Sequence, residues 1–174
     1  MSLIILALIA GMIILGMVFT PKGSCDGCSH GHDHGHHHND KKSGLIIVNV
    51  LDKQAYDDCH IADSINVALD ELDDFAQTVD KKDAELVFYC SNYRCTASGF
   101  AAKKLKKDGF EHVWAYEGGA AEWYQKGLPV EGPCAAKYLR KEVQIADDMH
   151  NEDIPVITAL ELKSKIDKEA KRAA

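Results

Sequence analysis

The sequence lacks an excess of basic residues. Its 20 lysines and arginines are outnumbered by 27 aspartates and glutamates, which gives a formal net charge of −7. The densest basic cluster (Lys103, Lys104, Lys106 and Lys107) falls in an expected helix and is explained by its solvated face. Proteins that bind nucleic acids generally present a basic stripe to the phosphate backbone. The composition therefore argues against nucleic acid as a partner.

The chain also lacks the cysteine spacing of a small secreted domain held together by disulfides. Six cysteines are spread over 174 residues, a length that allows one domain of ordinary size with its own apolar core plus appendages. We therefore expect Cys59 to be a buried, inert thiol and Cys134 to be an unremarkable thiol, with sulfur acceptance by Cys134 as the alternative if the linker passes the loop.

Residues 1–21 contain no charged side chain, and residues 3–19 are apolar apart from two glycines. A helix of this length spans about 26 Å, the short end of what crosses a bilayer. A cleavable signal peptide is the alternative, but no Lys or Arg precedes the run and no small-x-small cleavage site follows it. We predict a single-pass membrane anchor at residues 1–21. Lys22, directly after it, favours a cytoplasmic domain.

Residues 22–44 have almost no apolar content, which predicts a flexible tether. Cysteine and histidine side chains of this tract suit zinc, copper or nickel. The candidate ligands are Cys25, Cys28, His30, His32, His34, His36, His37 and His38. The alternatives are a solvated spacer and a purification tag. Metal handling by the tether stays open as a function of a different class.

The most informative stretch runs from Glu85 to Gly109. The apolar run Leu86–Tyr89 predicts a strand buried on both faces of a parallel sheet, and it ends on Cys90. Apolar residues then recur at helical spacing between Ala97 and Leu105. Loop amides and the positive end of this helix would favour the Cys90 thiolate, which is the reactive form. The alternative is a buried cysteine that merely ends a strand.

Other segments alternate in the same way. Strands are expected at Leu45–Leu51, Ile61–Val67 and His112–Tyr116, and helices at Lys53–Cys59 and Glu71–Val79. This alternation predicts an α/β domain over residues 45–131, with a parallel sheet, helices on both faces and the reactive loop at the carboxyl ends of the strands.

Motifs in this domain resemble the rhodanese (sulfurtransferase) family. They are LIIVNVL from Leu45, HIADSINV from His60, the strand entering Cys90, YEGGAAEW from Tyr116 and GLPV from Gly127. The resemblance implies that Cys90 takes sulfane sulfur from a small donor, either thiosulfate or a persulfide, and passes it to an acceptor thiol or cyanide without a cofactor. It further implies that Arg94 supplies positive charge. The amides of the loop that follows Cys90 would cradle the persulfide and the donor's anionic part, which assigns substrate binding to Ser91, Asn92, Tyr93 and Thr96.

The loop departs from the family pattern at Cys95, where the family often has Arg. One interpretation is a resolving thiol that attacks a persulfide or sulfenate on Cys90 and closes a disulfide, giving a thiol redox protein. The other is a small residue that packs against the helix. A related phosphatase would need Arg six positions after Cys90, where this chain has Thr96. The first core strand also has Asn49 and Leu51 where the family has Asp and Arg.

The domain begins without the short strand and helix that open the family's fold. The segment Ile154–Glu169 resembles that missing unit, with Thr158 at the N-cap and Leu160, Leu162 and Ile166 at helical spacing. We hypothesise a circular permutation, in which residues 132–153 form a linker with a short helix near 135–146, and residues 154–174 complete the domain. The alternative is the remnant of a second tandem domain.

Overall fold

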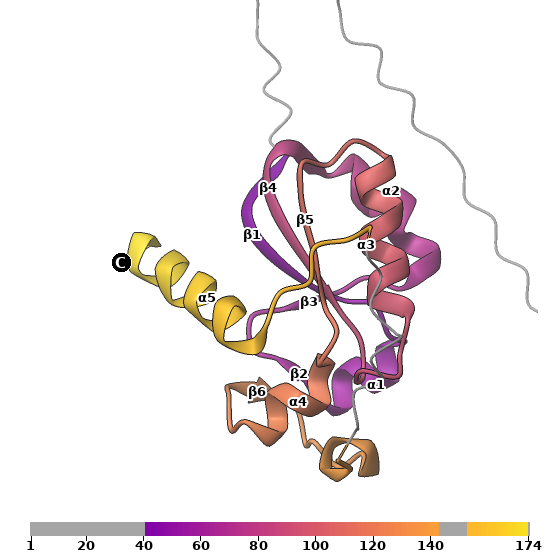
Figure 1. The fold of residues 1–174 in the computed structure, drawn as a ribbon, viewed down its shortest axis with the longest axis vertical. Helices are drawn as coiled ribbons and strands as arrows, with labels where there is room; N and C mark the ends of the chain where they lie inside the picture. Colours follow the sequence, from indigo (N-terminus) through magenta and orange to yellow (C-terminus); the bar gives the residue numbers. More distant parts are fainter. Residues whose placement is uncertain (1–40, 143–152, 174) are drawn as a thin grey trace, which may run out of the picture. The chain divides into compact units, whose positions relative to one another are not determined.

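The computed structural model describes residues 41–142 and 153–173. Its centre is a parallel sheet of order β3-β1-β4-β5 (Figure 1). The strands are β1 (Lys42–Asn49), β3 (Ile65–Asn66), β4 (Val79–Tyr89) and β5 (His112–Tyr116). Two short strands, β2 (His60–Ile61) and β6 (Val130–Glu131), form a separate antiparallel pair. The predicted α/β class with a parallel sheet is confirmed.

Strand β4 lies between β1 and β5 and carries the centre of the core. Leu86 and Phe88 point to one face of the sheet, whereas Val87 and Tyr89 point to the other, and all four are fully buried. A strand covered on both faces needs apolar residues at every position, because neither face meets water. This explains the continuous apolar run that identified the strand.

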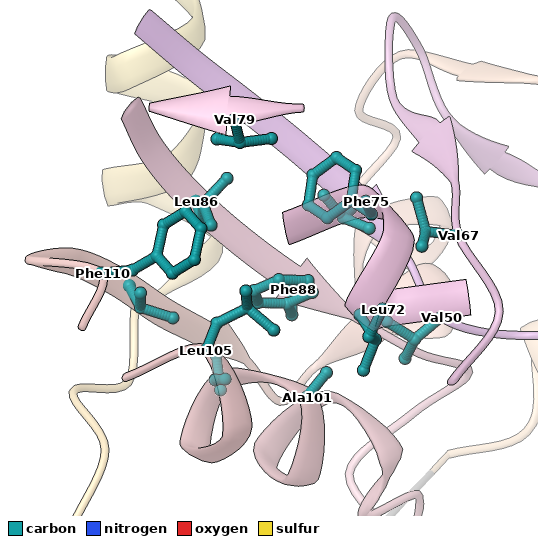
Figure 2. Packing of buried hydrophobic residues seen from close by; sticks show 14 of the residues in the cluster. Val50, Val67, Leu72, Phe75, Val79, Leu86, Phe88, Ala101, Leu105 and Phe110 are labelled. Atoms are coloured by element: carbon teal, nitrogen blue, oxygen red, sulfur yellow. The ribbon is translucent and has the colours of Figure 1, made fainter. Parts of the chain in front are cut away.

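One face of the sheet is covered by α2 (Leu72–Gln77) and α3 (Ala97–Lys107). Figure 2 shows Leu72 and Phe75 of α2 packing with Phe88 of β4 and with Ala101 and Leu105 of α3. Helix α2 ends earlier than its apolar spacing predicts, since Val79 pairs with Lys42 and begins β4 instead.

The other face is covered by elements from later in the chain. They are α4 (Gly119–Gln125), the 3₁₀ turn η2 (Lys137–Arg140) and α5 (Ala159–Ala173). Trp123, Leu139 and Leu162 from these elements are buried in one cluster. Helices on both faces are therefore confirmed. The remaining short elements are α1 (Lys53–Asp58) and η1 (Leu69–Glu71).

The C-terminal segment packs on the edge of the sheet next to β5. Val156 forms a parallel bridge with Ala115, and the Ala115 amide donates to the Pro155 carbonyl at 3.1 Å. Thr158 and Glu161 then exchange backbone hydrogen bonds at the start of α5, as a capping box does. Leu162 is buried, but Leu160 is 75% exposed and does not face the core as its spacing predicts. The contact that the permutation hypothesis requires is present, and the permutation itself stays a prediction.

Cys59 and Cys134 are joined in a disulfide, with their Cα atoms 4.5 Å apart. The prediction of two separate thiols is therefore wrong. The bond connects the end of α1 to the segment that follows β6 and closes a loop across a sequence separation of 75. Local sequence carries no sign of this pairing, because the partners are separated by 75 positions in the chain.

Within the described residues, no helix is both long enough and apolar enough to cross a membrane. The apolar run 3–19, on which the predicted anchor rests, lies outside the described residues.

Candidate active site

Cys90 directly follows β4 at the carboxyl end of the central strand, and its side chain is fully buried. The first turn of α4 forms hydrogen bonds with the start of the loop that follows Cys90. The Ala120 amide donates to the Cys90 carbonyl and the Ala121 amide to the Ser91 carbonyl, both at 2.9 Å. The first turn of α4 therefore fixes the backbone on which the thiol sits.

This close approach depends on Gly119, which has a φ of +60°. A Cβ there would lie 2.5 Å from the Cys90 carbonyl oxygen and 2.8 Å from the Asn92 nitrogen. Both atoms belong to the backbone of the active-site loop, so they cannot rotate away as a side chain would.

We expect Gly119→Ala to lower the free energy of unfolding by about 3 kcal/mol, through the left-handed backbone and the displaced loop together. Gly99→Ala is the matched control, because no atom lies within 4 Å of a Cβ built at that position in α3. Urea unfolding of both variants measures the difference, and equal stabilities would show that the loop does not need its close approach to Gly119.

The thiols of Cys90 and Cys95 are in hydrogen-bond contact. Cys90 Sγ also lies 3.1 Å from the Cys95 carbonyl oxygen and 3.4 Å from Ser98 Oγ. Both cysteines are free, and Cys95 is the more exposed of the two. The loop therefore brings together the two sulfur atoms that the sequence places five residues apart.

Hydrogen bonds divide the charge of this pair unevenly. The Cys90 thiol, the Ala97 amide, and the amide and hydroxyl of Ser91 lower the pKa of Cys95 to about 5. The hydrogen bond to Cys95, followed by burial, raises the pKa of Cys90. At neutral pH the pair carries one proton and one negative charge, and the charge lies mainly on Cys95. The hydroxyl and amide of Ser98, in the first turn of α3, lower the pKa of Cys90, but the hydrogen bond to Cys95 and burial outweigh them.

The other predicted loop residues shape the loop. The Asn92 side chain accepts a hydrogen bond from the Arg94 amide and the Asn92 carbonyl accepts one from the Cys95 amide, both at 2.9 Å. These two amides are therefore not available to cradle a persulfide as predicted. Arg94 is exposed, and Thr96 precedes α3 without a capping bond from its side chain.

Tyr93 ties the outer part of the loop to α4. Its hydroxyl hydrogen-bonds to Glu122, which also accepts a bond from the Tyr116 hydroxyl at 2.8 Å. Burial, together with the charge of Glu122, raises the pKa of Tyr93 to about 12, so this phenol stays a hydrogen-bond donor at physiological pH.

Two residues that contact the loop cysteines or the loop tyrosine were not predicted from the sequence. Ser98 reaches the Cys90 thiol from the first turn of α3, and Glu122 anchors the loop tyrosine from α4. A serine two residues after Thr96 would have been a usable signal, because the first turn of that helix faces the loop. Glu122 had no comparable signal, since its partners are distant in sequence.

A cavity of 140 Å³ opens beside Cys95. It is lined by Tyr93, Cys95, Thr96, Ser98, Gly99, Phe100 and Glu117. Of the two thiols, Cys95 lines this cavity, and Cys90 is not among its lining residues. The candidate metal ligands of the tether, Cys25 to His38, lie outside the described residues.

The site consists of a cysteine loop between a strand and a helix, at the carboxyl edge of a parallel sheet. Comparison with known proteins identifies a family with this arrangement. A family model described as "Rhodanese-like domain" matches residues 34–126. Thiosulfate sulfurtransferase GlpE of Coxiella burnetii is 31% identical over 83 residues, which cover 48% of this chain and 75% of that protein.

The corresponding protein of Pseudomonas syringae is 34% identical over the same length, covering 76% of that protein. Among solved structures, the BH2092 protein of Bacillus halodurans is 30% identical and has a TM-score of 0.49, covering 63% of this chain and 74% of that one. The chain belongs to the rhodanese-like domain family.

Proposed function

We propose that this protein is a sulfurtransferase that carries sulfane sulfur as a persulfide on Cys90. Its relatives from Coxiella burnetii and Pseudomonas syringae are named thiosulfate sulfurtransferases. Thiosulfate or a persulfide is therefore the donor class that we favour, with a thiol as the acceptor.

The observation that carries the proposal is the contact between the Cys90 and Cys95 thiols at the end of β4. A sulfur nucleophile must lose its proton in order to attack, and the thiolate is the reactive form. Cys95, which already carries the negative charge, is placed to take the proton of Cys90 as Cys90 attacks.

The transfer then proceeds in two displacements. Cys90 Sγ attacks the outer sulfur of thiosulfate, the bond between the two sulfur atoms of the donor breaks, and sulfite leaves with the electron pair. The Cys90 proton passes to Cys95. In the second step an acceptor thiolate attacks the outer sulfur of the persulfide, and Cys90 leaves and takes its proton back from Cys95.

The same contact supports a second candidate function, that of a thiol redox protein. The Cys95 thiolate can attack the inner sulfur of a Cys90 persulfide, which forms the Cys90–Cys95 disulfide and expels the outer sulfur as hydrosulfide. The two thiols are oxidised, and the sulfane sulfur is reduced to sulfide. A reductant of the dithiol class must then restore the pair.

Cys95→Ser separates the two functions. Sulfur transfer from thiosulfate to cyanide should survive this change, but its pH profile should move. In the wild type the thiolate of the pair forms as the pH rises through about 5, the value to which the pKa of Cys95 is lowered. In the variant, Cys90 alone must ionise, and burial places its pKa above that of a free thiol, about 8.5.

We therefore expect the acidic limb of kcat/KM to move by more than about three pH units and the rate at pH 7 to fall by roughly thirtyfold or more. Complete loss of transfer, together with loss of sulfide release, would instead favour the redox function. Cys90→Ala is the matched control, since it should remove both activities.

Three further features belong to this proposal. Anchoring by residues 3–19 and binding of zinc, copper or nickel by the tether rest on residues outside the described part. The Cys59–Cys134 disulfide favours an oxidising compartment for the domain, because such bonds are rare in the reducing cytosol. It thus opposes the cytoplasmic orientation that Lys22 indicates, and we propose that the domain faces the oxidising side.

A further inference from the structure

Two residues that line the cavity beside Cys95 also contact the catalytic sulfur. Cys90 Sγ lies 3.1 Å from the Cys95 carbonyl oxygen and 3.4 Å from Ser98 Oγ, and both of these residues line the cavity. A persulfide on Cys90 adds a further sulfur atom at a bond length of about 2 Å. These contacts indicate the cavity as the approach by which an acceptor reaches the outer sulfur of the persulfide.

The cavity is small and partly aromatic. Its volume is 140 Å³. A water molecule takes up about 30 Å³ in the liquid, so the cavity has room for roughly five non-hydrogen atoms. Phe100, which is 60% exposed, and Tyr93 both line it. Aromatic side chains of this kind are typical of ligand pockets. The size and lining of the cavity favour a thiol on a short carbon chain over a peptide thiol.

The cavity carries negative charge. Glu117, the residue directly after β5, contributes a carboxylate, and no lysine or arginine is among the described residues that line the cavity. Arg94 lies between two lining residues in the sequence, but it is exposed and does not line the cavity. The charge of Glu117 acts on this loop, since it adds to burial and to Glu122 in raising the pKa of Tyr93.

Negative charge in this cavity matters for the second step of the proposed transfer. An attacking thiolate and the persulfide are both anionic, and the carboxylate of Glu117 adds a third negative charge. A positive charge on the acceptor offsets this repulsion. An ammonium group also favours ionisation of a thiol on the same molecule, because it stabilises the thiolate. The acceptor that suits the cavity therefore carries both a thiol and an amine.

We propose that the acceptor is a small primary aminothiol, whose ammonium group binds to Glu117 while its carbon chain packs against Phe100. Its thiolate attacks the outer sulfur of the persulfide, and the bond between the two persulfide sulfur atoms breaks. The acceptor leaves as a persulfide, and Cys90 takes its proton back from Cys95. The inference rests on the proposed function, since it names the acceptor class of that same site.

The test compares two acceptors with the same number of non-hydrogen atoms, cysteamine and 2-mercaptoethanol. The full chain, with Cys25→Ser and Cys28→Ser to remove the tether thiols, is loaded with thiosulfate and freed of donor. Intact mass then follows the loss of the extra sulfur atom above the rate without acceptor. Per thiolate, we expect cysteamine to react about fivefold faster, as for one partly exposed ion pair. Its lower thiol pKa alone would make its thiolate the weaker nucleophile.

Three variants assign this preference to Glu117. Glu117→Gln should lower the ratio of the two rates to about one or less, whereas Glu117→Asp, which keeps the charge, should largely retain it. Glu111→Gln is the matched control, because it removes an exposed carboxylate before β5, at the opposite end of that strand, and should leave the ratio unchanged.

A ratio near one in the wild type would overturn the inference alone, whatever the variants do. An unchanged ratio in Glu117→Gln, or an equal fall in Glu111→Gln, would also overturn it. If the wild type acquired no sulfur from thiosulfate at all, the proposed function would fail and the inference with it.

Discussion

Replacing Cys90 by serine is expected to lower sulfur transfer from thiosulfate to cyanide by roughly a thousandfold or more. The serine hydroxyl is not ionised at neutral pH and cannot carry sulfane sulfur. The side chains are similar in size, so the fully buried site after β4 should remain packed. Thiocyanate formation, measured under saturating thiosulfate, gives the effect directly.

Cys95→Ser serves as the internal comparison, because it retains Cys90 and should retain measurable transfer. If instead Cys90→Ser kept most of the activity while Cys95→Ser lost it, the sulfur would be carried on Cys95. The charge distribution of the pair makes this comparison informative, since Cys95 is the more exposed thiol and lines the cavity.

Removing the disulfide is expected to have the largest effect on stability. The double variant Cys59→Ala/Cys134→Ala should lose about 4 kcal/mol of unfolding free energy, as expected for a closed loop with a sequence separation of 75 residues. The segment after β6, residues 132–141, should also become sensitive to proteases, because its covalent attachment to the end of α1 is gone.

Urea denaturation with and without a reductant provides the control for this prediction. A reductant that opens the bond should bring the wild type down to the stability of the double variant, and it should leave that variant unchanged. Equal stabilities of the wild type and the variant without reductant would show that the Cys59–Cys134 disulfide does not stabilise the fold.

The elements that the sequence predicted are those with a local cause. The run Leu86–Tyr89 identified the central strand because both faces of β4 are buried, and the helical spacing after Thr96 identified α3. The segment around Thr158 was also predicted, since its capping residues and apolar spacing are local. Its position beside β5 was inferred only from what the domain lacked at its start.

The features that escaped prediction depend on contacts between distant residues. Cys59 and Cys134 are joined next to the hydrogen bond from the Ala135 amide to Asp58, and both contacts link residues more than 70 positions apart. The thiolate was assigned to Cys90 because the loop amides and the positive end of the following helix were expected to converge on its sulfur. In the folded loop the hydrogen bond from the Cys90 thiol, together with the donors of Ala97 and Ser91, lowers the pKa of Cys95, and the spacing of the two cysteines does not reveal this contact.

The most direct test of the account is the intact mass of the full chain carrying Cys25→Ser and Cys28→Ser after treatment with thiosulfate. In the described part of the chain Cys90 and Cys95 are the free cysteines, and Cys59 and Cys134 are bonded. The account predicts a gain of one sulfur atom that Cys90→Ser abolishes. A loss of two hydrogen atoms that either Cys90→Ser or Cys95→Ser abolishes would contradict it and establish a disulfide switch on a rhodanese-like fold.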